Sequence, residues 1–487
     1  MSTIVELGFA TTTTARVVVR SDVAGVVQVI GAGSHGYAYA DPAINDGIVA
    51  VDLSGLTPGQ RYPVDIKVGG ISVDAAIVQA MPDSGPFGVV FTTCHGALRG
   101  WPHADWLRSR EQRGEPRIVS WVKQGDYPYL ETNAWESNQR SFGQLLRTFS
   151  SRLAAGDTDA ELLECIRAHY RQVRLLPGHR EVSREIPGLL DAGDDHRYSG
   201  DNAYGKIPDA PSAGDWDEIL NASGTPGQGG ANKDGANLPQ DAAAYRRMIS
   251  LCDTVQQEWA IGNPPNPAVN SDPRNARSWW YSHRIGGLEI FVIEMIGVRD
   301  LKTKTAPRYC MGSDGVQYAW LKQALIDSTA KFKAIASPKP FWEYSDGWDL
   351  YAERDDFENF IDRAVNGGNP DGWATPGGVF MMCGDMHYPY IKASQKLSTF
   401  GVGPTTQTFH VLPNGYGGNS IYRATGYQSN TGDRITGLRG AYNNCVVVDV
   451  YDEYAEISLR RPHGGIGTRG RIYAGSNAYV GVAVQMA

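Results

Sequence analysis

The chain has 487 residues, enough for two domains, and its 41% hydrophobic and 20% charged residues are typical of soluble globular proteins. The net charge of −8, without a basic run, argues against binding to a nucleic-acid scaffold. The apolar runs, such as residues 87–91 and 288–293, fall well short of the roughly 20 residues of a membrane span, so no span is expected.

Residues 1–84 predict a small all-β domain. Short β-branched runs alternate with turn residues at intervals typical of a β-sandwich. The phrase LSGLTPGQRYPVDIKV (53–68) resembles the strand-turn-strand phrase of fibronectin type III domains, and another small all-β domain is the alternative. The start of this domain has no basic segment before an apolar core. We therefore expect a cytoplasmic or virion-associated protein, or an exported one whose leader is absent from this sequence.

Residues 85–487 mix strands with helices and predict a layered α/β domain. Apolar periodicity favours helices over 142–156, 158–173 and 316–335, and Thr158 and Glu161 have the spacing of a capping box. A stretch rich in Gly and Pro near 206–240 indicates a long surface insertion. The six cysteines form no CxxC pair, which favours free thiols.

Three apolar strands end in chemically similar polar residues. FTTC ends on Cys94, QGDYPY carries Asp126 and Tyr129, and MMCGDMH carries Asp385 and His387. A strand fixes position, Gly lets the backbone turn, and Asp and His with one residue between them lie on one face of an extended chain. These groups predict a metal centre at the strand ends. By ligand type alone, the metal could be zinc or manganese.

A fourth polar segment reads LDAGDDHRYSGDN (190–202). Its four Asp residues repel one another unless a positive charge lies among them, so the loop predicts a metal or substrate site. Nucleophilic serine chemistry is not indicated, because the chain has neither a G-x-S-x-G motif nor a Gly-rich phosphate loop.

The order TC, GDYPY, DDHRYSGDN, GDMH resembles the PhoD-like alkaline phosphatases, a branch of the calcineurin-like metallophosphoesterases. In that family the corresponding motifs at the strand ends and in the loop read SC, GDYxYE, WDDHExxNN or DDHDxGxN, and GDxH. The resemblance covers most of the chain from about residue 85, and SDGWDLYAERD (345–355) is similar to a further family phrase. It implies a four-layer αββα sandwich after the all-β domain, and a centre of ferric iron and calcium.

Carried over residue by residue, the resemblance implies these metal ligands: Cys94, Asp126, Tyr129 and His387 for iron, and Asp126, Asn202 and Asp385 for calcium. This sequence also departs from the family. Gly193 stands where the family has Trp, and the loop is one residue longer than DDHDxGxN, which leaves Asn202 or Asp201 as the ligand. The phrase FVIEMIGVRD keeps Arg299 but has Glu294 and Ile296 in place of Asp and Arg, a change that predicts altered substrate specificity or weak activity.

The favoured function is a metal-dependent phosphoesterase that hydrolyses phosphomonoesters or phosphodiesters with a metal-bound hydroxide. Asp195 would orient His196 or bind a cation, His196 would contact phosphate or protonate the leaving group, and Arg299 would stabilise transition-state charge. Arg197 is the candidate for substrate binding. These roles have competing interpretations. His196 and Arg197 could simply be exposed to solvent, and Arg299 could form a structural ion pair.

Two other functions remain open on the sequence. The first is a structural or binding protein on a phosphatase-like scaffold, for example a virion or surface-assembly component with weak or no activity. The second is hydrolysis of a different bond by the same kind of centre. An oligomer or assembly is compatible with the sequence.

Overall fold

The structure is a computed structural model. It describes residues 2–482 apart from 32, 94–100, 102, 126–155, 191–197, 199–203, 220–241, 265–278, 342–346, 386–389, 403–426, 429–433, 438–444 and 461–465. Of the predicted helices, the one over 142–156 lies almost wholly outside the described residues. No helix in the described ranges is long and apolar enough to cross a membrane.

The N-terminal region is all β, as predicted. Two antiparallel sheets, in the orders β1-β2-β5 and β4-β3-β6-β7, use strands β1 (Thr3–Ala10), β2 (Thr14–Ser21), β3 (Gly25–Gly31), β4 (Ser34–Ala40), β5 (Ile48–Ser54), β6 (Arg61–Val68) and β7 (Ile71–Gln79). The phrase over 53–68 spans the end of β5, a turn and β6. The fibronectin type III assignment and the boundary near residue 84 stay predictions.

Two larger sheets follow. The first has the order β10-β9-β8-β19-β20-β21-β22 and contains β8 (Phe87–Thr92), β9 (Ile118–Lys123), β10 (Gly188–Leu190), β19 (Cys445–Val450), β20 (Tyr454–Arg460), β21 (Ile466–Tyr473) and β22 (Tyr479–Val482). The second has the order β11-β12-β13-β14-β16-β15-β18-β17 and contains β11 (Tyr281–Ile285), β12 (Leu288–Val292), β13 (Phe332–Ser337), β14 (Val379–Cys383), β15 (Tyr390–Ala393), β16 (Ser398–Gly401), β17 (Tyr427–Gln428) and β18 (Arg434–Gly437).

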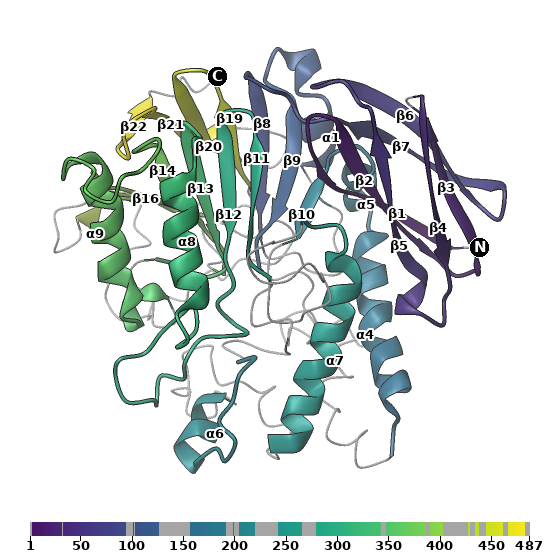
Figure 1. The fold of residues 1–487 in the computed structure, drawn as a ribbon, viewed down its shortest axis with the longest axis horizontal. Coiled ribbons are helices and arrows are strands. Elements are labelled where there is room, and N and C mark those ends of the chain that lie inside the picture. The colour runs from purple at the N-terminus through teal and green to yellow at the C-terminus, as the bar shows by residue number, and fades with distance from the viewer. Residues whose placement is uncertain are drawn as a thin grey trace.

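The larger sheets pack face to face between two layers of helices. Val89 of β8 and Phe380 of β14 lie in one core that joins the sheets. The outer face of β12–β14 packs against α8 (Val316–Asp327) and α9 (Glu353–Val365), which lie beside that sheet in Figure 1. The outer face of β8, β9 and β19 packs against α1 (Ala104–Arg108) and the end of α5 (His179–Ser183). The four layers confirm the predicted fold class.

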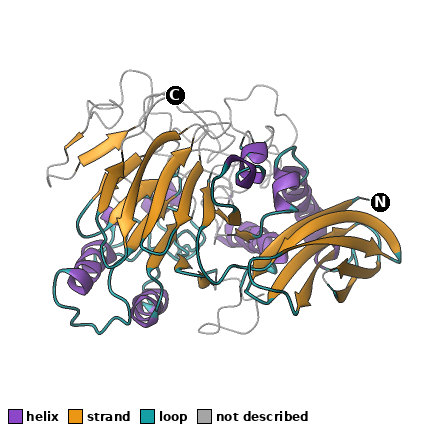
Figure 2. Ribbon diagram, turned by 90° about the horizontal axis from the view of Figure 1, so that it is seen from above, coloured by secondary structure: helices purple, strands orange, loops and turns teal. Residues whose placement is uncertain are grey.

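Two long helices join the N-terminal sheets to the rest of the molecule. They are α4 (Asp159–Arg174) and α7 (Ala242–Ala260), which share a core with Ile4, Val18 and Ile48 of strands β1, β2 and β5. The predicted capping box at the start of α4 is present: the Thr158 backbone N–H donates to Glu161 at 2.8 Å, and the Glu161 N–H donates to Thr158 at 3.3 Å. In Figure 2 the N-terminal strands form a group beside the two larger sheets.

A buried ion cluster crosses the same boundary. Glu6 of β1 lies 3.4 Å from Nζ of Lys123, at the end of β9, and 3.1 Å from Nε of Arg174 in α4. The Arg174 guanidinium stacks 3.7 Å from the ring centre of Trp259 in α7. Burial opposes charge on Glu6, but Arg174 and Lys123 hold the pKa of its carboxyl below the usual value. The N-terminal sheets are therefore linked to the larger sheets by charge as well as by apolar packing.

The helix predicted over 316–335 is too long. Helix α8 ends at Asp327, where Ser328 takes an extended conformation, and residues Phe332–Ser337 form the buried strand β13. Strand β13 lies between β12 and β14 in the second sheet, and pairing on both sides favours the extended conformation over a local preference for helix. Within the predicted insertion, Ala213–Ile219 form helix α6, and residues 220–241 lie outside the described residues.

Two buried histidines predict acid sensitivity. Burial lowers the pKa of His169 in α4 and of His283 in β11 to about 4, from 6.5. Between these pH values the unfolded chain binds protons that the folded chain does not, so the free energy of unfolding falls as the pH falls. Each histidine accounts for up to roughly 3 kcal/mol by pH 4.

Urea unfolding between pH 7 and pH 4.5 checks this expectation. Replacing His169 or His283 with Leu is expected to flatten the decline in unfolding free energy with falling pH, whatever it does to stability at pH 7. His35 in β4 is exposed, so His35→Leu is the matched control and should leave the slope unchanged. Equal slopes in all four proteins would show that the buried histidines do not set the acid sensitivity.

Candidate functional site

The predicted site lies at one edge of the two larger sheets. Strands β8 and β9 are parallel, and so are β12, β13 and β14, so their carboxyl ends emerge together within each sheet. Cys94 follows β8 in the sequence, Asp126 follows β9, and Asp385 and His387 follow β14. This arrangement is the one that places ligand sites at the carboxyl ends of parallel strands in α/β proteins.

Side-chain and backbone contacts hold these strand ends of the two sheets together. The buried amide of Gln124, just past β9, donates to the carbonyl of Met382 in β14 at 2.6 Å and to that of Ser337 in β13 at 3.2 Å. The Thr93 hydroxyl, just past β8, lies 3.4 Å from the carbonyl of Gly125. The ends of β8, β9, β13 and β14 therefore meet at one place.

Glycine is required where β14 meets the other sheet. A Cβ atom at Gly384 would lie 2.9 Å from the carbonyl oxygen of Pro338 and 3.1 Å from that of Gln124. The next residue, Asp385, has φ of 67°, a left-handed conformation that non-glycine residues seldom adopt and that is concentrated at functional sites. The prediction that the glycine turns and that Asp385 is extended was wrong: Gly384 is required by the close approach of two carbonyl groups, and the left-handed residue is Asp385.

Asp385 is the one predicted metal ligand among the described residues, and it pairs with a lysine. Nζ of Lys339, just past β13, lies 2.7 Å from Oδ1 of Asp385. The Lys339 side chain is 0% exposed and that of Asp385 is 13% exposed. Lys339 was not among the predicted site residues, although its position directly after a buried strand, in SPKP, is the signal that marked the other strand ends.

The remaining predicted site residues, apart from Arg299, lie outside the described residues; these are Cys94, Asp126, Tyr129, Asp195, His196, Arg197, Asn202 and His387. Among the residues that the structure does describe, no group of three or more His, Cys, Asp or Glu side chains is placed to hold a metal ion. The carboxylate of Asp385 suits a hard cation by type, and the Lys339 ammonium already lies at one of its oxygens. The metal-ligand assignments therefore stay predictions.

Arg299 follows β12 and is completely buried. Its guanidinium stacks over the ring of Tyr204, with Cζ 4.3 Å from the ring centre. Its backbone N–H donates to the carbonyl of Met295 at 2.7 Å, which closes a turn in the segment after β12. This packing supports a structural contribution from Arg299, and the transition-state role stays a prediction.

The substituted segment around Glu294 is tightly held. Glu294 is buried, and its carboxylate accepts a hydrogen bond from the backbone of Gly297. Gln317 of α8 accepts from the Glu294 N–H and donates to the Glu294 carbonyl, both at 2.7 Å. Glu294 thus stabilises the turn that carries Arg299.

Two residues of the phrase over 345–355, Trp348 and Glu353, hydrogen-bond to segments next to the same strand ends. The indole of Trp348 donates to the hydroxyl of Ser337 at 3.1 Å, and that hydroxyl donates to the Lys339 carbonyl at 2.7 Å. Glu353, at the start of α9, accepts from the backbone N–H groups of Cys310 and Met311 at 3.1 and 3.2 Å. These two residues of the phrase position the backbone near Lys339 and the loop before α8.

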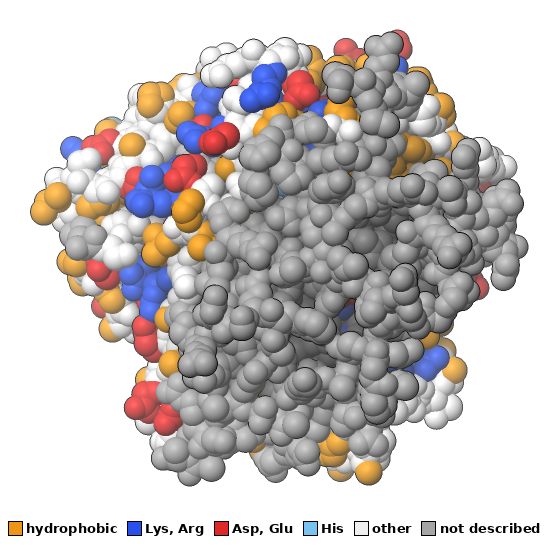
Figure 3. Space-filling view, turned by 180° about the vertical axis from the view of Figure 1, so that it is seen from behind, with side chains coloured by type: hydrophobic (Ala, Val, Ile, Leu, Met, Phe, Trp, Pro, Cys, Tyr) orange, Lys and Arg blue, Asp and Glu red, His pale blue; other side chains and the backbone are white. Residues whose placement is uncertain are grey.

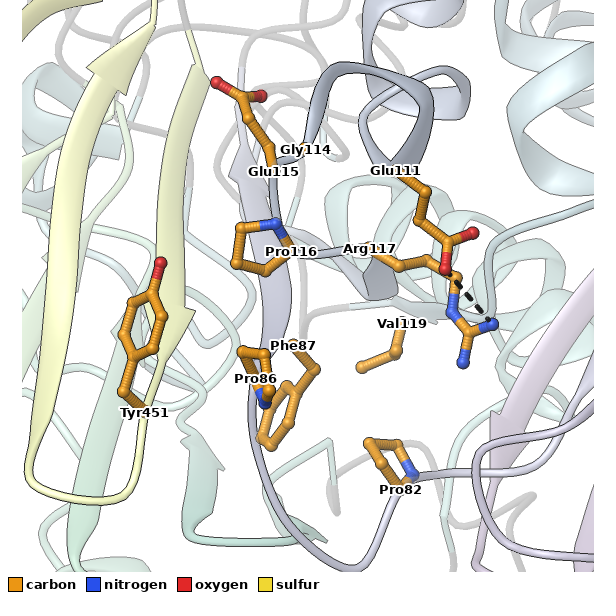
Figure 4. Close-up of a pocket in the computed structure, with 10 residues that line it drawn as sticks. All are labelled: Pro82, Pro86, Phe87, Glu111, Gly114, Glu115, Pro116, Arg117, Val119 and Tyr451. Atoms are coloured by element: carbon orange, nitrogen blue, oxygen red, sulfur yellow. Dashed lines mark ion pairs between the residues drawn. The ribbon is translucent and has the colours of Figure 1, made fainter.

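A cavity of about 390 Å³ lies at the opposite ends of β8 and β9. Figure 4 shows Phe87, the first residue of β8, with Arg117 and Glu111 across the opening. Arg117 lies 3.8 Å from Glu111, and its guanidinium donates to the carbonyl of Gly59 at 2.6 Å. Because it lies at the amino ends of these strands, this cavity is separate from the candidate metal centre.

The two larger sheets and their flanking helices form a four-layer αββα sandwich whose parallel strands end at one place. The chain is similar to the solved structure of PhoD, with 15% identity, a TM-score of 0.67 and coverage of 99% of this chain and 92% of PhoD. It is also similar to the purple acid phosphatase PPD1 from yellow lupin (Lupinus luteus) seeds, with 11% identity, a TM-score of 0.53 and coverage of 96% and 73%. No protein-family model matches the sequence, and neither does any curated protein.

These likenesses show the fold and confirm the predicted one. The resemblance of the four motifs pointed to a PhoD-like architecture, and the similarity to PhoD extends over nearly the whole chain, N-terminal sheets included. Identities this low carry no information about activity. The chemistry therefore depends on the residues at the strand ends.

Proposed function

We propose that the protein is a metal-dependent phosphoesterase that hydrolyses phosphomonoesters or phosphodiesters. The observation that carries the proposal is the convergence of β8, β9 and β14, which lead into Cys94, Asp126 and Asp385. A scaffold shared with PhoD and with a purple acid phosphatase supports a phosphate ester as substrate. A buried, hydrogen-bonded junction between two sheets gives a rigid base for such a site.

The ligands proposed from the motifs combine a thiolate, a phenolate, an imidazole and carboxylates, with ferric iron and calcium as the metals that the resemblance implies. Bound metal ions would supply a water of lowered pKa and positive charge for the phosphate oxygens. In this proposal Cys94, Asp126, Tyr129 and His387 would hold the first metal, and Asn202 and Asp385 would complete the centre with Asp126.

The other residues have roles in binding and proton transfer. His196 would contact the phosphate or protonate the leaving-group oxygen, with Asp195 orienting its imidazole. Arg197 would bind a phosphate oxygen, for which a guanidinium is well suited. Arg299, whose guanidinium stacks over the Tyr204 ring, would contribute positive charge that stabilises the transition state.

Removal of metal tests the proposal. Dialysis against a chelator is expected to abolish hydrolysis of p-nitrophenyl phosphate and bis-p-nitrophenyl phosphate, and re-addition of ferric iron and calcium should restore it. The two substrates rank monoester against diester cleavage. Hydrolysis that continues after the metal content has fallen to zero would exclude a metal-dependent reaction.

A further inference from the structure

Lys339 is a buried cation at the candidate metal centre. Its side chain is 0% exposed, and its ammonium lies 2.7 Å from Oδ1 of Asp385. The residue is held in place by its backbone, because the Ser337 hydroxyl donates to its carbonyl at 2.7 Å and itself accepts from Trp348. Lys339 is therefore a fixed part of the strand-end junction.

The pairing determines what else can bind to Asp385. An ammonium has three N–H donors and a full positive charge, and a carboxylate oxygen attracts ammonium and calcium for the same electrostatic reason. A divalent cation that used Oδ1 would have to displace the ammonium or lie against it, and like charges at that distance repel strongly in a buried site. Displacement would break the 2.7 Å ion pair between a fully buried ammonium and a carboxylate, which is costly.

We propose that the Lys339 ammonium is a resident cation of the centre and occupies, at Asp385, the place that the family resemblance gives to calcium. This inference rests on the proposed function and revises one part of it, because Lys339 then takes the place of calcium at Asp385 in the proposed ligand set. The wild-type protein would then hold its first metal ion without a calcium ion on Asp385. The positive charge on that side of the site would come from the chain itself.

The chain offers a matched control. Lys333, in the same strand β13, is also 0% exposed, but its ammonium binds the carbonyl oxygens of Ala330 and Thr375, both at 2.7 Å. Lys333→Met therefore removes a buried ammonium that is not paired with a candidate metal ligand. Lys339→Met and Lys333→Met are expected to differ in calcium binding if the pairing with Asp385 matters.

The test uses the full chain, stripped with chelator and reconstituted with ferric iron. Bound calcium is measured by equilibrium dialysis and elemental analysis, and thermal unfolding is followed with and without calcium. Lys339→Met is expected to bind one calcium ion per chain more than wild type and to gain more thermal stability from calcium, whereas Lys333→Met behaves like wild type. The double variant Lys339→Met/Asp385→Asn should lose the extra calcium.

Several outcomes would overturn the inference. The first is equal calcium binding by wild type and Lys339→Met. The second is a calcium ion bound to the wild type that the single substitution Asp385→Asn removes. The third is a Lys339→Met protein that stays unfolded even with calcium while the double variant folds. If Lys339→Met unfolds without calcium and refolds with it, the inference is supported. If no protein takes up any metal, iron included, the proposed function fails and the inference with it, so the two failures are distinguishable.

Discussion

Replacing Asp126 with Asn is expected to remove metal and hydrolysis together while leaving the fold intact. Asp126 follows β9 and Gly125, where the Thr93 hydroxyl and the Gln124 amide join the strand ends. An amide lacks the charge of a carboxylate, so a metal that it helps to hold is bound more weakly. Loss of even an outer partner of a metal ligand costs about 10- to 100-fold in activity, so we expect at least ~100-fold here.

Elemental analysis, phosphate-ester hydrolysis and thermal unfolding on the same sample check this result. Asp355→Asn is the control, because Asp355 has an 80% exposed side chain on α9 and pairs with its neighbour Arg354. The control should keep full activity and metal. If Asp126→Asn retained both, the assignment of the centre to these strand ends would be wrong.

Replacing Glu6 with Gln is expected to destabilise the whole molecule by about 3–5 kcal/mol, the usual effect of removing one partner from a buried ion pair. Glu6 is 7% exposed, and the change would leave Lys123 and Arg174, which are 4% and 1% exposed, without its negative charge. Because the cluster joins the N-terminal sheets to β9 and α4, both parts should unfold in one transition at lower urea.

The control for Glu6→Gln is an exposed pair on the same sheet. Asp52 in β5 lies 2.7 Å from Arg16 and its side chain is 57% exposed, so Asp52→Asn should cost no more than about 1 kcal/mol. On the described part of the face seen in Figure 3, Lys and Arg side chains lie beside Asp and Glu, and surface pairs of this kind contribute little. Equal effects of the two substitutions would mean that the cluster does not join the two regions.

The sequence was informative wherever local chemistry decides structure. The capping box at Thr158 and Glu161, the apolar strands before Gly125 and Gly384, and the alternating N-terminal runs all depend on neighbours within a few residues. The four-layer fold was anticipated through the family resemblance of the four motifs, and the strands before three of them, β8, β9 and β14, each have a neighbour on both sides.

Long-range pairing was not predictable from the sequence. Nothing local indicates that Lys339 would meet Asp385, or that the Gln124 amide would donate to Met382 and Ser337 across two sheets. The end of α8 was misjudged because the helical pattern over 316–335 overlaps the apolar stretch at 332–337, which forms strand β13 between β12 and β14. The ligand set itself stays a prediction from the motifs.

The most direct test of the metallophosphoesterase account is the metal content of the purified protein, measured with hydrolysis of p-nitrophenyl phosphate and bis-p-nitrophenyl phosphate on the same sample. The account predicts stoichiometric metal that includes iron, together with cleavage of at least one of the two esters. A folded protein that binds no metal after reconstitution with iron and calcium, and cleaves neither ester, would contradict it and favour a structural or binding role for the scaffold.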